Sequence, residues 1–152
     1  MEFDEVIARR HSVRSYTSRV PLDGDIMKIL NAADQAPSAG GLKSRRFFVV
    51  KDKYIRLKLA AASLDQEFVA EAPIVLVFCA DLDLISSYGD RGRDLYCIQD
   101  TAAAVENALL KAVDLGLGAC WVGAFEEEIV AKICRLPAWL RPVALVTIGY
   151  EK

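Results

Sequence analysis

The sequence predicts a single α+β domain over residues 1–152, with a sheet flanked by helices. Helix and strand patterns are mixed along the chain without the strict alternation that produces a doubly wound sheet. The segment Ile74–Ala80 is continuously apolar, which is typical of a central strand buried on both faces. The longest helix pattern, Asp94–Leu115, is apolar nearly all round, which indicates a helix buried at the centre of its surroundings.

The first half of the chain predicts three helices and one strand before Ile74–Ala80. Residues 2–10 and Tyr54–Ala62 are short helix patterns, and residues 22–35 carry apolar residues at the i, i+3, i+4, i+7 spacing of an amphipathic helix. The polar stretch His11–Pro21 connects the first two helices and ends at a proline. Phe47–Lys51 is a short apolar strand pattern.

The second half begins with a polar, glycine-bearing segment, Asp81–Arg93, which predicts a mobile loop. After the long helix, Gly116 and Gly118 are expected to end it, since glycine is favoured just beyond helix C-termini. The remaining predicted elements are the strand Cys120–Val122, the helix Glu126–Cys134 with acidic residues in its first turn, and the strand Val143–Tyr150.

Composition narrows the classes of partner. The apolar fraction is 53% and the net charge is −2, and the mean hydropathy of +0.22 is high for a soluble chain. No apolar run approaches the roughly 20 residues that cross a bilayer. The apolar surplus therefore predicts either an unusually dry core or a large face on a partner chain. The lack of a basic excess disfavours nucleic acid as a partner.

The N-terminus and the cysteines favour a cytoplasmic protein without a metal site. The start, Met-Glu-Phe-Asp-Glu, lacks the basic and apolar regions of a secretory signal peptide. A single histidine excludes multi-histidine metal sites. The cysteines have neither metal-ligand nor redox-motif spacing and are expected to be buried thiols in a reducing compartment; they are Cys79, Cys97, Cys120 and Cys134.

The segment Arg9–Ser15 is the first whose side chains could bind a ligand. It places three arginines, a histidine and two hydroxyls between two helices. Guanidinium and hydroxyl groups in fixed geometry are suited to holding a phosphate. The alternative is a solvated basic loop, and composition alone does not decide between the two.

Two further segments are rich in small residues. In Pro37–Gly41, adjacent glycines would let the backbone approach a flat ligand closely, although an ordinary helix-ending loop is the alternative. In Gly116–Phe125, an apolar strand runs into small residues and then into a helix, so backbone N–H groups could face a ring ligand. The alternative there is a buried edge strand followed by a plain loop.

Taken in order, the three segments resemble the nitroreductase family of FMN-dependent oxidoreductases. The resemblance is carried by Arg-His-Ser-Val-Arg at 10–14, Ala-Pro-Ser-Ala-Gly at 36–40 and Gly-Leu-Gly-Ala-Cys-Trp-Val-Gly at 116–123. Ile148-Gly149-Tyr150 also looks like the last core strand of that family. The resemblance covers nearly the whole chain. It implies a nitroreductase-like fold, with helices flanking a central mixed or antiparallel sheet, and an interlocked homodimer.

The resemblance also implies where FMN binds. Arg10, Ser12 and His11 would lie near its phosphate or ribityl chain, and Arg14 near the flavin N1/O2 edge, where positive charge stabilises the reduced ring. The second segment would reach the flavin of the partner subunit, and the third would supply backbone donors near N5. The implied cofactor-binding residues are Arg10, His11, Ser12, Arg14, Pro37, Ser38, Ala39, Gly40, Gly41, Lys43, Val122, Gly123 and Ala124.

Two departures from the family pattern affect these expectations. The family often continues Ser-Ala-Gly with Asn-x-Gln-Pro-Trp, whereas this chain has Gly41-Leu42-Lys43-Ser44-Arg45. Lys43 is therefore expected either to donate near the flavin or to point into water. The family also often carries a phosphate-binding basic residue beyond the last strand. Here the sequence ends at Lys152, so we expect phosphate binding to depend on Arg10, Ser12 and Arg14.

The implied function is hydride transfer from NAD(P)H through bound FMN to a nitroaromatic, quinone or flavin acceptor by a ping-pong mechanism. The cofactor carries that chemistry, so no side chain is assigned as a catalytic acid, base or nucleophile. The alternatives are a flavin-binding protein without turnover, a relative that activates oxygen or removes a halide, and a dimeric protein whose flavin site has decayed. The sequence does not choose between NADH and NADPH.

Overall fold

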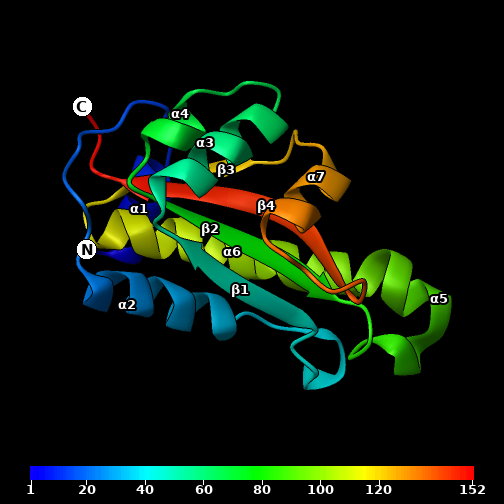
Figure 1. The fold of residues 1–152 in the computed structure, drawn as a ribbon. Coiled ribbons are helices and arrows are strands. Elements are labelled where there is room, and N and C mark those ends of the chain that lie inside the picture. Colours follow the sequence, from blue (N-terminus) through cyan, green and yellow to red (C-terminus); the bar gives the residue numbers. More distant parts are fainter.

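The computed structural model describes residues 1–152 as an antiparallel sheet with helices on both faces (Figure 1). The strand order is β1-β2-β4-β3, and every neighbouring pair is antiparallel, which decides between the mixed and antiparallel alternatives. None of the helices combines the length and apolar character that crossing a bilayer requires. The strands are β1 (Arg45–Val50), β2 (Ile74–Asp81), β3 (Gly118–Val122) and β4 (Leu140–Gly149).

The helices form one layer on each side of the sheet. Short 3₁₀ turns occur at Ala39–Gly41 and Ser86–Tyr88, and a π turn at Gly92–Tyr96 leads into the longest helix. The α-helices are α1 (Phe3–Arg9), α2 (Asp23–Asp34), α3 (Lys53–Ala62), α4 (Phe68–Glu71), α5 (Gly89–Arg91), α6 (Cys97–Asp114) and α7 (Glu127–Ile133).

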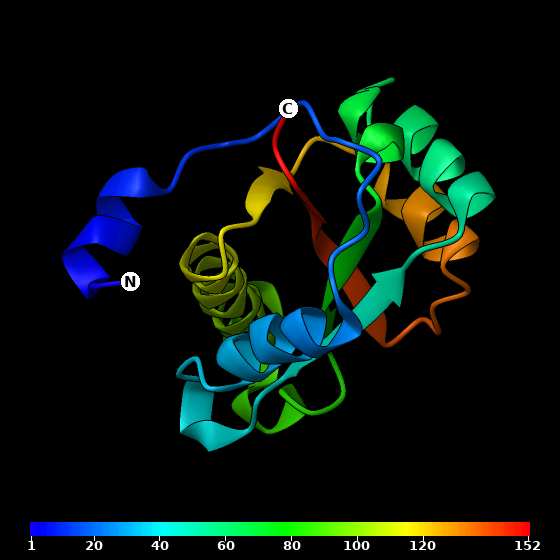
Figure 2. The same cartoon turned by 90° about the vertical axis from the view of Figure 1, so that its left-hand side faces the viewer.

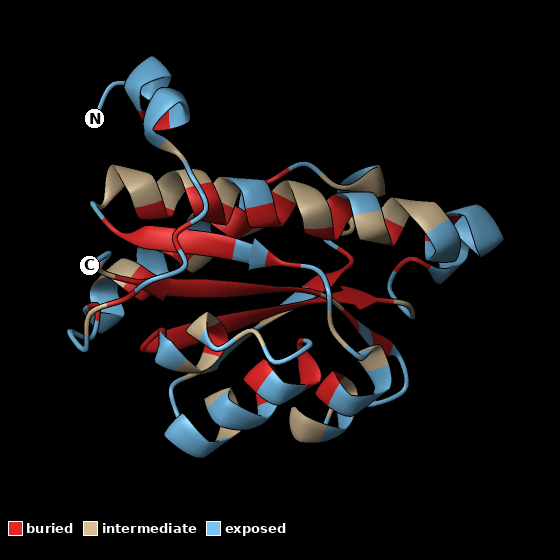
Figure 3. Ribbon diagram, turned by 90° about the horizontal axis from the view of Figure 1, so that it is seen from above, coloured by how far each residue is buried: buried red, intermediate tan, exposed pale blue.

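The two faces of the sheet have separate cores. Alternate residues of β2 and β4 pack against α2 and α6 on one face, and the intervening ones pack against α3, α4 and α7 on the other. All eight residues of β2 are buried, which confirms the prediction of a central strand at Ile74–Ala80. Figure 3 shows this buried sheet between its two layers of helices.

The helix α6 is buried on one side only. Its core face includes Ala104, Val105 and Ala108, whereas much of the remainder is half-exposed. The helix α1 stands away from the sheet beside α6 (Figure 2), and its residues Phe3 and Ile7 are 67% and 50% exposed. The apolar surplus of the sequence therefore stays partly uncovered on a single chain.

Three strand boundaries differ from the prediction. β1 begins at Arg45 rather than within Phe47–Lys51, because the buried Arg45 still pairs with Ala80 of β2. β3 begins at Gly118 rather than Cys120, so Gly116 alone ends the long helix, with a φ of +72°. β4 extends back to Leu140, beyond the predicted Val143–Tyr150, through a bulge opposite Phe78 and Cys79.

The prediction of a mobile loop at Asp81–Arg93 is wrong, because most of this segment is helical. The Asp81 carboxylate accepts backbone N–H bonds from Asp83 and Leu84, at 3.2 and 2.9 Å, and so forms a tight turn. Ile85 is fully buried and anchors the segment. Helical turns then run from Ser86 into α6. The short α4 was also not predicted, since four residues carry too little periodicity.

The ends of β3 and β4 meet at a pair of glycines. Gly118 and Gly149 are cross-strand partners. A Cβ at Gly118 would lie 2.9 Å from the Val13 methyl groups, and one at Gly149 would lie 2.7 Å from Pro73 Cδ and 2.8 Å from Tyr16 Cδ1. Because neither glycine has a side chain, the segment containing Val13 and Tyr16 packs directly against this end of the sheet.

We expect Gly149→Ala to destabilise the fold by about 1–3 kcal/mol, because the added methyl group would overlap two packed side chains. Urea denaturation followed by circular dichroism measures this. Gly24→Ala is the matched control: Gly24 lies in α2 with open space around it, so alanine there is expected to be neutral or to stabilise. Equal stability of the two variants would contradict the packing argument.

Candidate functional site

The first predicted segment lies along the outer edge of β3. Arg10 ends α1, and its backbone N–H donates to Val6 at 3.0 Å. Two residues later, Ser12 forms a parallel bridge with Ala119, and the Val13 N–H donates to the Ala119 carbonyl at 3.0 Å. The fold therefore brings the first and third predicted segments together at one end of the sheet.

A buried tyrosine fastens this segment to the sheet. The Tyr16 hydroxyl lies 2.7 Å from both the Val13 carbonyl and the Thr147 hydroxyl of β4. The Tyr16 backbone N–H donates to the Glu71 carboxylate at 2.6 Å, and Glu71 also pairs with Lys152 at 2.7 Å. These contacts hold the pKa of Glu71 below its usual range, the Lys152 hydrogen bond contributing most.

Two arginines of the segment lack carboxylate partners. The arginines that form ion pairs are Arg9, Arg46 and Arg141; Arg10 and Arg14 are not among them. Burial raises the pKa of the Cys120 thiol in β3, and Arg14, Ser12 and Arg10 each oppose that rise. Arg10, Ser12 and Arg14 therefore lie close enough to Cys120 of β3 to act on its thiol, and neither arginine forms an ion pair.

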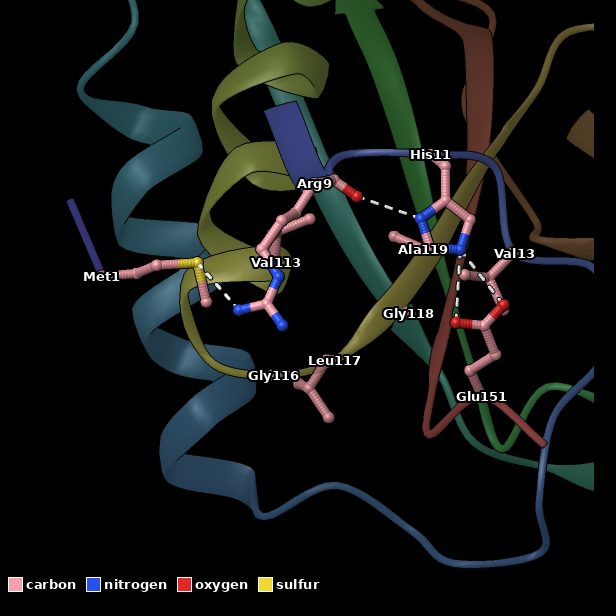
Figure 4. Close-up of a pocket in the computed structure, with 10 residues that line it drawn as sticks. All are labelled: Met1, Arg9, His11, Val13, Val113, Gly116, Leu117, Gly118, Ala119 and Glu151. Carbon is pink, nitrogen blue, oxygen red and sulfur yellow. Dashed lines mark hydrogen bonds and ion pairs between the residues drawn. The ribbon is translucent and has the colours of Figure 1, made fainter. Parts of the chain in front are cut away.

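His11 binds a carboxylate that the sequence analysis missed. Its Nδ1 lies 3.0 Å from the Arg9 carbonyl, and its Nε2 lies 3.1 and 3.2 Å from the Glu151 carboxylate oxygens (Figure 4). Because a carbonyl and a carboxylate both accept hydrogen bonds, this arrangement favours the imidazolium form, in which both ring nitrogens donate. The pKa of His11 is raised accordingly, first by the Arg9 carbonyl and then by Glu151. Nothing in the sequence links residues 11 and 151, since only the sheet brings them together.

A cavity of about 220 Å³ opens beside this histidine, between α1, the end of α6 and β3. Figure 4 shows the ion pair of His11 and Glu151 at one side of the cavity and Arg9 at another. Its lining residues are Met1, Arg9, His11, Val13, Val113, Gly116, Leu117, Gly118, Ala119 and Glu151. The cavity thus combines a charged rim with an apolar floor from the third segment.

The third segment leaves a free sheet edge. The Ala119 carbonyl points outward to Val13, so alternation along the strand points the Trp121 backbone toward the same edge. Val122 is buried in the core, whereas Gly123 and Ala124 are exposed just beyond the strand. The backbone of residues 121–124 is therefore accessible on the side where Arg10 and Arg14 lie.

The second segment lies at the opposite end of the molecule. In Figure 1 residues 36–44 form the loop at the lower right, whereas both termini lie at the left. The 18-residue helix α6, about 27 Å long, spans much of this separation. A single chain therefore does not unite Pro37–Gly41 with the other two segments.

Two buried charged residues shape this second segment. The Arg45 guanidinium donates to the carbonyls of Pro37 and Asp100, each at 3.0 Å, and to those of Asp34 at 3.1 Å and Ala36 at 2.6 Å. Burial lowers the pKa of Arg45, while Asp100 and Asp34 oppose this. Arg45 was not identified as a buried residue from the sequence, although its place just before the apolar strand residues could have indicated this.

Asp100 fixes the other side of the same loop. Its Oδ1 accepts the Ala39 N–H at 2.9 Å, and its Oδ2 accepts the Ser44 hydroxyl at 2.8 Å. Within the loop, the Ser38 hydroxyl accepts the Lys43 N–H at 2.9 Å, and the Lys43 ammonium forms an ion pair with Asp34 of α2. Lys43 thus has an anionic partner within its own chain rather than an ammonium group pointing freely into water.

Comparisons with known proteins agree on one family. Residues 7–150 match the Nitroreductase family. The chain is 37% identical over 152 residues to a protein of Archaeoglobus fulgidus named "Putative NADH dehydrogenase/NAD(P)H nitroreductase", covering 97% of this chain and 84% of that one.

Solved structures give the same result. A nitroreductase family protein from Clostridium novyi NT superposes with a TM-score of 0.90 at 34% identity, covering 100% of this chain and 86% of that chain. An FMN-dependent nitroreductase from Clostridium difficile superposes with a TM-score of 0.85 at 26% identity, covering 97% of this chain and 86% of that one. The antiparallel architecture described above is thus shared with proteins of this family.

We expect Arg45→Met to destabilise the protein by about 3 kcal/mol, since several buried carbonyls would lose their donors. Urea denaturation gives the free energy, and limited proteolysis should show faster cleavage within residues 36–44. Lys58→Met is the control, because this exposed lysine of α3 makes no ion pair and should shift stability by less than about 0.5 kcal/mol. Similar losses in both variants would contradict the structural role of Arg45.

Proposed function

The chain belongs to the nitroreductase family, and we propose that it is an FMN-dependent oxidoreductase that transfers hydride from NAD(P)H to a nitroaromatic, quinone or flavin acceptor in a ping-pong cycle. The observation that carries this proposal is the pair of guanidinium groups of Arg10 and Arg14, without carboxylate partners, beside the open edge of β3. Such a pair fits a ligand with a phosphate and a hydrogen-bonding ring.

The residues at this edge fit the two ends of FMN. Arg10, Ser12 and His11 would hold the phosphate, because they provide two cations and a hydroxyl within one short segment. Arg14 would lie at the ring edge, and the backbone around Val122, Gly123 and Ala124 would donate to the ring. When bound, FMN supplies the acceptance and donation of hydride, and the protein supplies position and charge.

The second segment supports a homodimer. In one chain, Pro37, Ser38, Ala39, Gly40, Gly41 and Lys43 lie far from the charged edge of β3. We propose that the partner subunit supplies them to the same flavin. The exposed apolar residues of α1 and the half-exposed side of α6 provide surface for that contact. The name of the Clostridium difficile relative, an FMN-dependent nitroreductase, supports the choice of cofactor.

The side chains of this site act by binding rather than by proton transfer. Arg14 would favour added negative charge on the ring, an electrostatic effect that needs no acid or base. His11, the one histidine, already donates both of its N–H groups. We also propose a cytoplasmic location, which agrees with four cysteines that are free thiols.

The absorption spectrum of the protein after addition of FMN and desalting tests the proposal. We expect retained flavin bands that NADH or NADPH bleaches under nitrogen, and that a nitroaromatic or quinone restores. A colourless protein would contradict FMN binding. Bands that persist with both nucleotides would contradict the oxidoreductase and leave a flavin-binding protein without turnover.

The phosphate assignment predicts two opposite changes in affinity. Arg10→Ala should weaken FMN binding about tenfold, because one charge-assisted contact to the phosphate is lost. At about pH 5.5, below the ordinary pKa of an imidazole, Glu151→Gln should strengthen FMN binding several-fold, because His11 stays protonated and no longer pairs with the Glu151 carboxylate in place of the phosphate. Riboflavin, which lacks the phosphate, should bind all three proteins equally well. Fluorescence quenching titrations measure these affinities, and parallel changes for riboflavin would contradict the assignment.

A further inference from the structure

The helical turns at Ser86–Tyr96 carry a packed aromatic group beside the second segment. Tyr88 fits between two glycines: a Cβ at Gly40 would overlap the Tyr88 hydroxyl, and a Cβ at Gly92 would lie 2.6 Å from Tyr88 Cβ. The rings of Tyr88 and Tyr96 then meet edge to face, with centroids 5.5 Å apart. Through Tyr88, the aromatic pair thus packs against the loop that we place at the partner's flavin.

An arginine is held on this aromatic pair. The Arg91 guanidinium lies 5.5 Å from the centroid of the Tyr96 ring, and its Nε donates to the Tyr96 hydroxyl at 3.0 Å. Arg91 forms no ion pair, and no protein group accepts from its two terminal nitrogens. Since the Nε contact fixes the plane of the guanidinium, those two nitrogens remain as a fork for a carboxylate.

None of the neighbouring charged residues forms an ion pair with the Arg91 guanidinium. Asp94 lies near Arg141, at the start of β4, whose pKa is raised mainly by its hydrogen bond to Glu127 and to a small extent by Asp94. Asp90 and Arg93 are exposed and of opposite charge, and neither forms an ion pair. The π turn that carries Arg93 and Tyr96 is an uncommon geometry that occurs often at functional sites.

We infer that Tyr88, Tyr96 and Arg91 form the acceptor subsite and select planar aromatic acceptors that carry a carboxylate. This inference rests on the proposed function, which places Gly40 against the flavin of the partner subunit. Tyr88, which is 43% exposed, offers aromatic surface to a flat ring, Tyr96 positions Arg91, and the Arg91 fork binds the carboxylate. Arg91 therefore acts in substrate selection and takes no part in hydride transfer.

The test compares two nitroarenes of nearly equal shape, 4-nitrobenzoate and 4-nitrobenzamide, with the FMN-loaded protein. Their intrinsic reactivities differ, so the quantity to follow is the ratio of their kcat/KM values in each variant relative to wild type. Arg91→Gln should lower this ratio about tenfold, the loss expected for one charge-assisted contact. Arg91→Lys should give an intermediate ratio, because it keeps the charge and loses the fork.

Two controls separate selection from a general loss of structure. Tyr96→Phe keeps the ring and removes the hydroxyl that orients Arg91, so it should lower the ratio partly. Arg93→Gln removes a charge from the same turn and should leave the ratio within twofold of wild type. All variants should retain FMN, and Arg93→Gln should also retain the wild-type KM for the reduced nicotinamide. An unchanged ratio in Arg91→Gln, or an equal fall in Arg93→Gln, would overturn the inference.

Binding without turnover gives an independent result. By calorimetry, the FMN-loaded protein should bind benzoate more tightly than benzamide, and Arg91→Gln should remove that difference. Equal binding of both ligands to wild type would overturn the acceptor subsite even if nitroarenes are reduced. If benzoate binds through Arg91 and no acceptor is reduced, Arg91 still binds a carboxylate, but the proposed oxidoreductase fails and the acceptor role of the subsite fails with it. A protein that retains no FMN would overturn both.

Discussion

The candidate site depends on the attachment of residues 11–17 to the end of the sheet. Gly118 and Gly149 face each other there without side chains, so Val13 and Tyr16 approach the backbone directly. Tyr16 is buried with its hydroxyl between a carbonyl and Thr147. This attachment adds a short fifth segment to the four-stranded sheet, at the β3 edge, and holds the backbone of residues 10–14 beside β3.

The buried charged residues of this chain have protein partners, whereas two exposed arginines have no anionic partner. At the second segment, Arg45 and Asp100 are buried and almost every donor and acceptor they carry has a protein partner, so they stabilise a loop. At the first segment, Arg10 and Arg14 remain accessible and lack anionic partners. Buried charges need internal compensation, whereas accessible unpaired charges are available to a ligand. The contrast distinguishes the residues that build the site from those that would bind.

The positions of the three segments in the fold explain why one chain does not bring all three together. The first and third meet because the parallel bridge of Ser12 and Ala119 joins them. The second lies beyond the far end of α6, with Tyr88 packed on Gly40. In the homodimer proposed above, a second subunit would bring its own second segment to this edge, and the uncovered apolar surface of α1 and α6 supports that proposal.

The sequence by itself determined the class of fold, the central strand and the family. Continuous apolar character identified Ile74–Ala80, and periodicity identified α2, because these patterns reflect burial against the nearest layer. The helices predicted at Tyr54–Ala62 and Glu126–Cys134 correspond to α3 and α7. The order of the small-residue and basic motifs indicated the family. These signals depend only on residues that are close in the sequence, so they can be recognised without knowledge of the tertiary fold.

Only the tertiary structure decided what depends on contacts between distant residues. The pairing of His11 with Glu151 arises because β4 returns beside residues 11–17, and no local pattern encodes it. The helical turns after Asp81 form because Ile85 is buried and Tyr88 packs on glycine, although the sequence there is polar. Burial and cross-strand contact are properties of the folded chain, and they override local propensity wherever the two disagree.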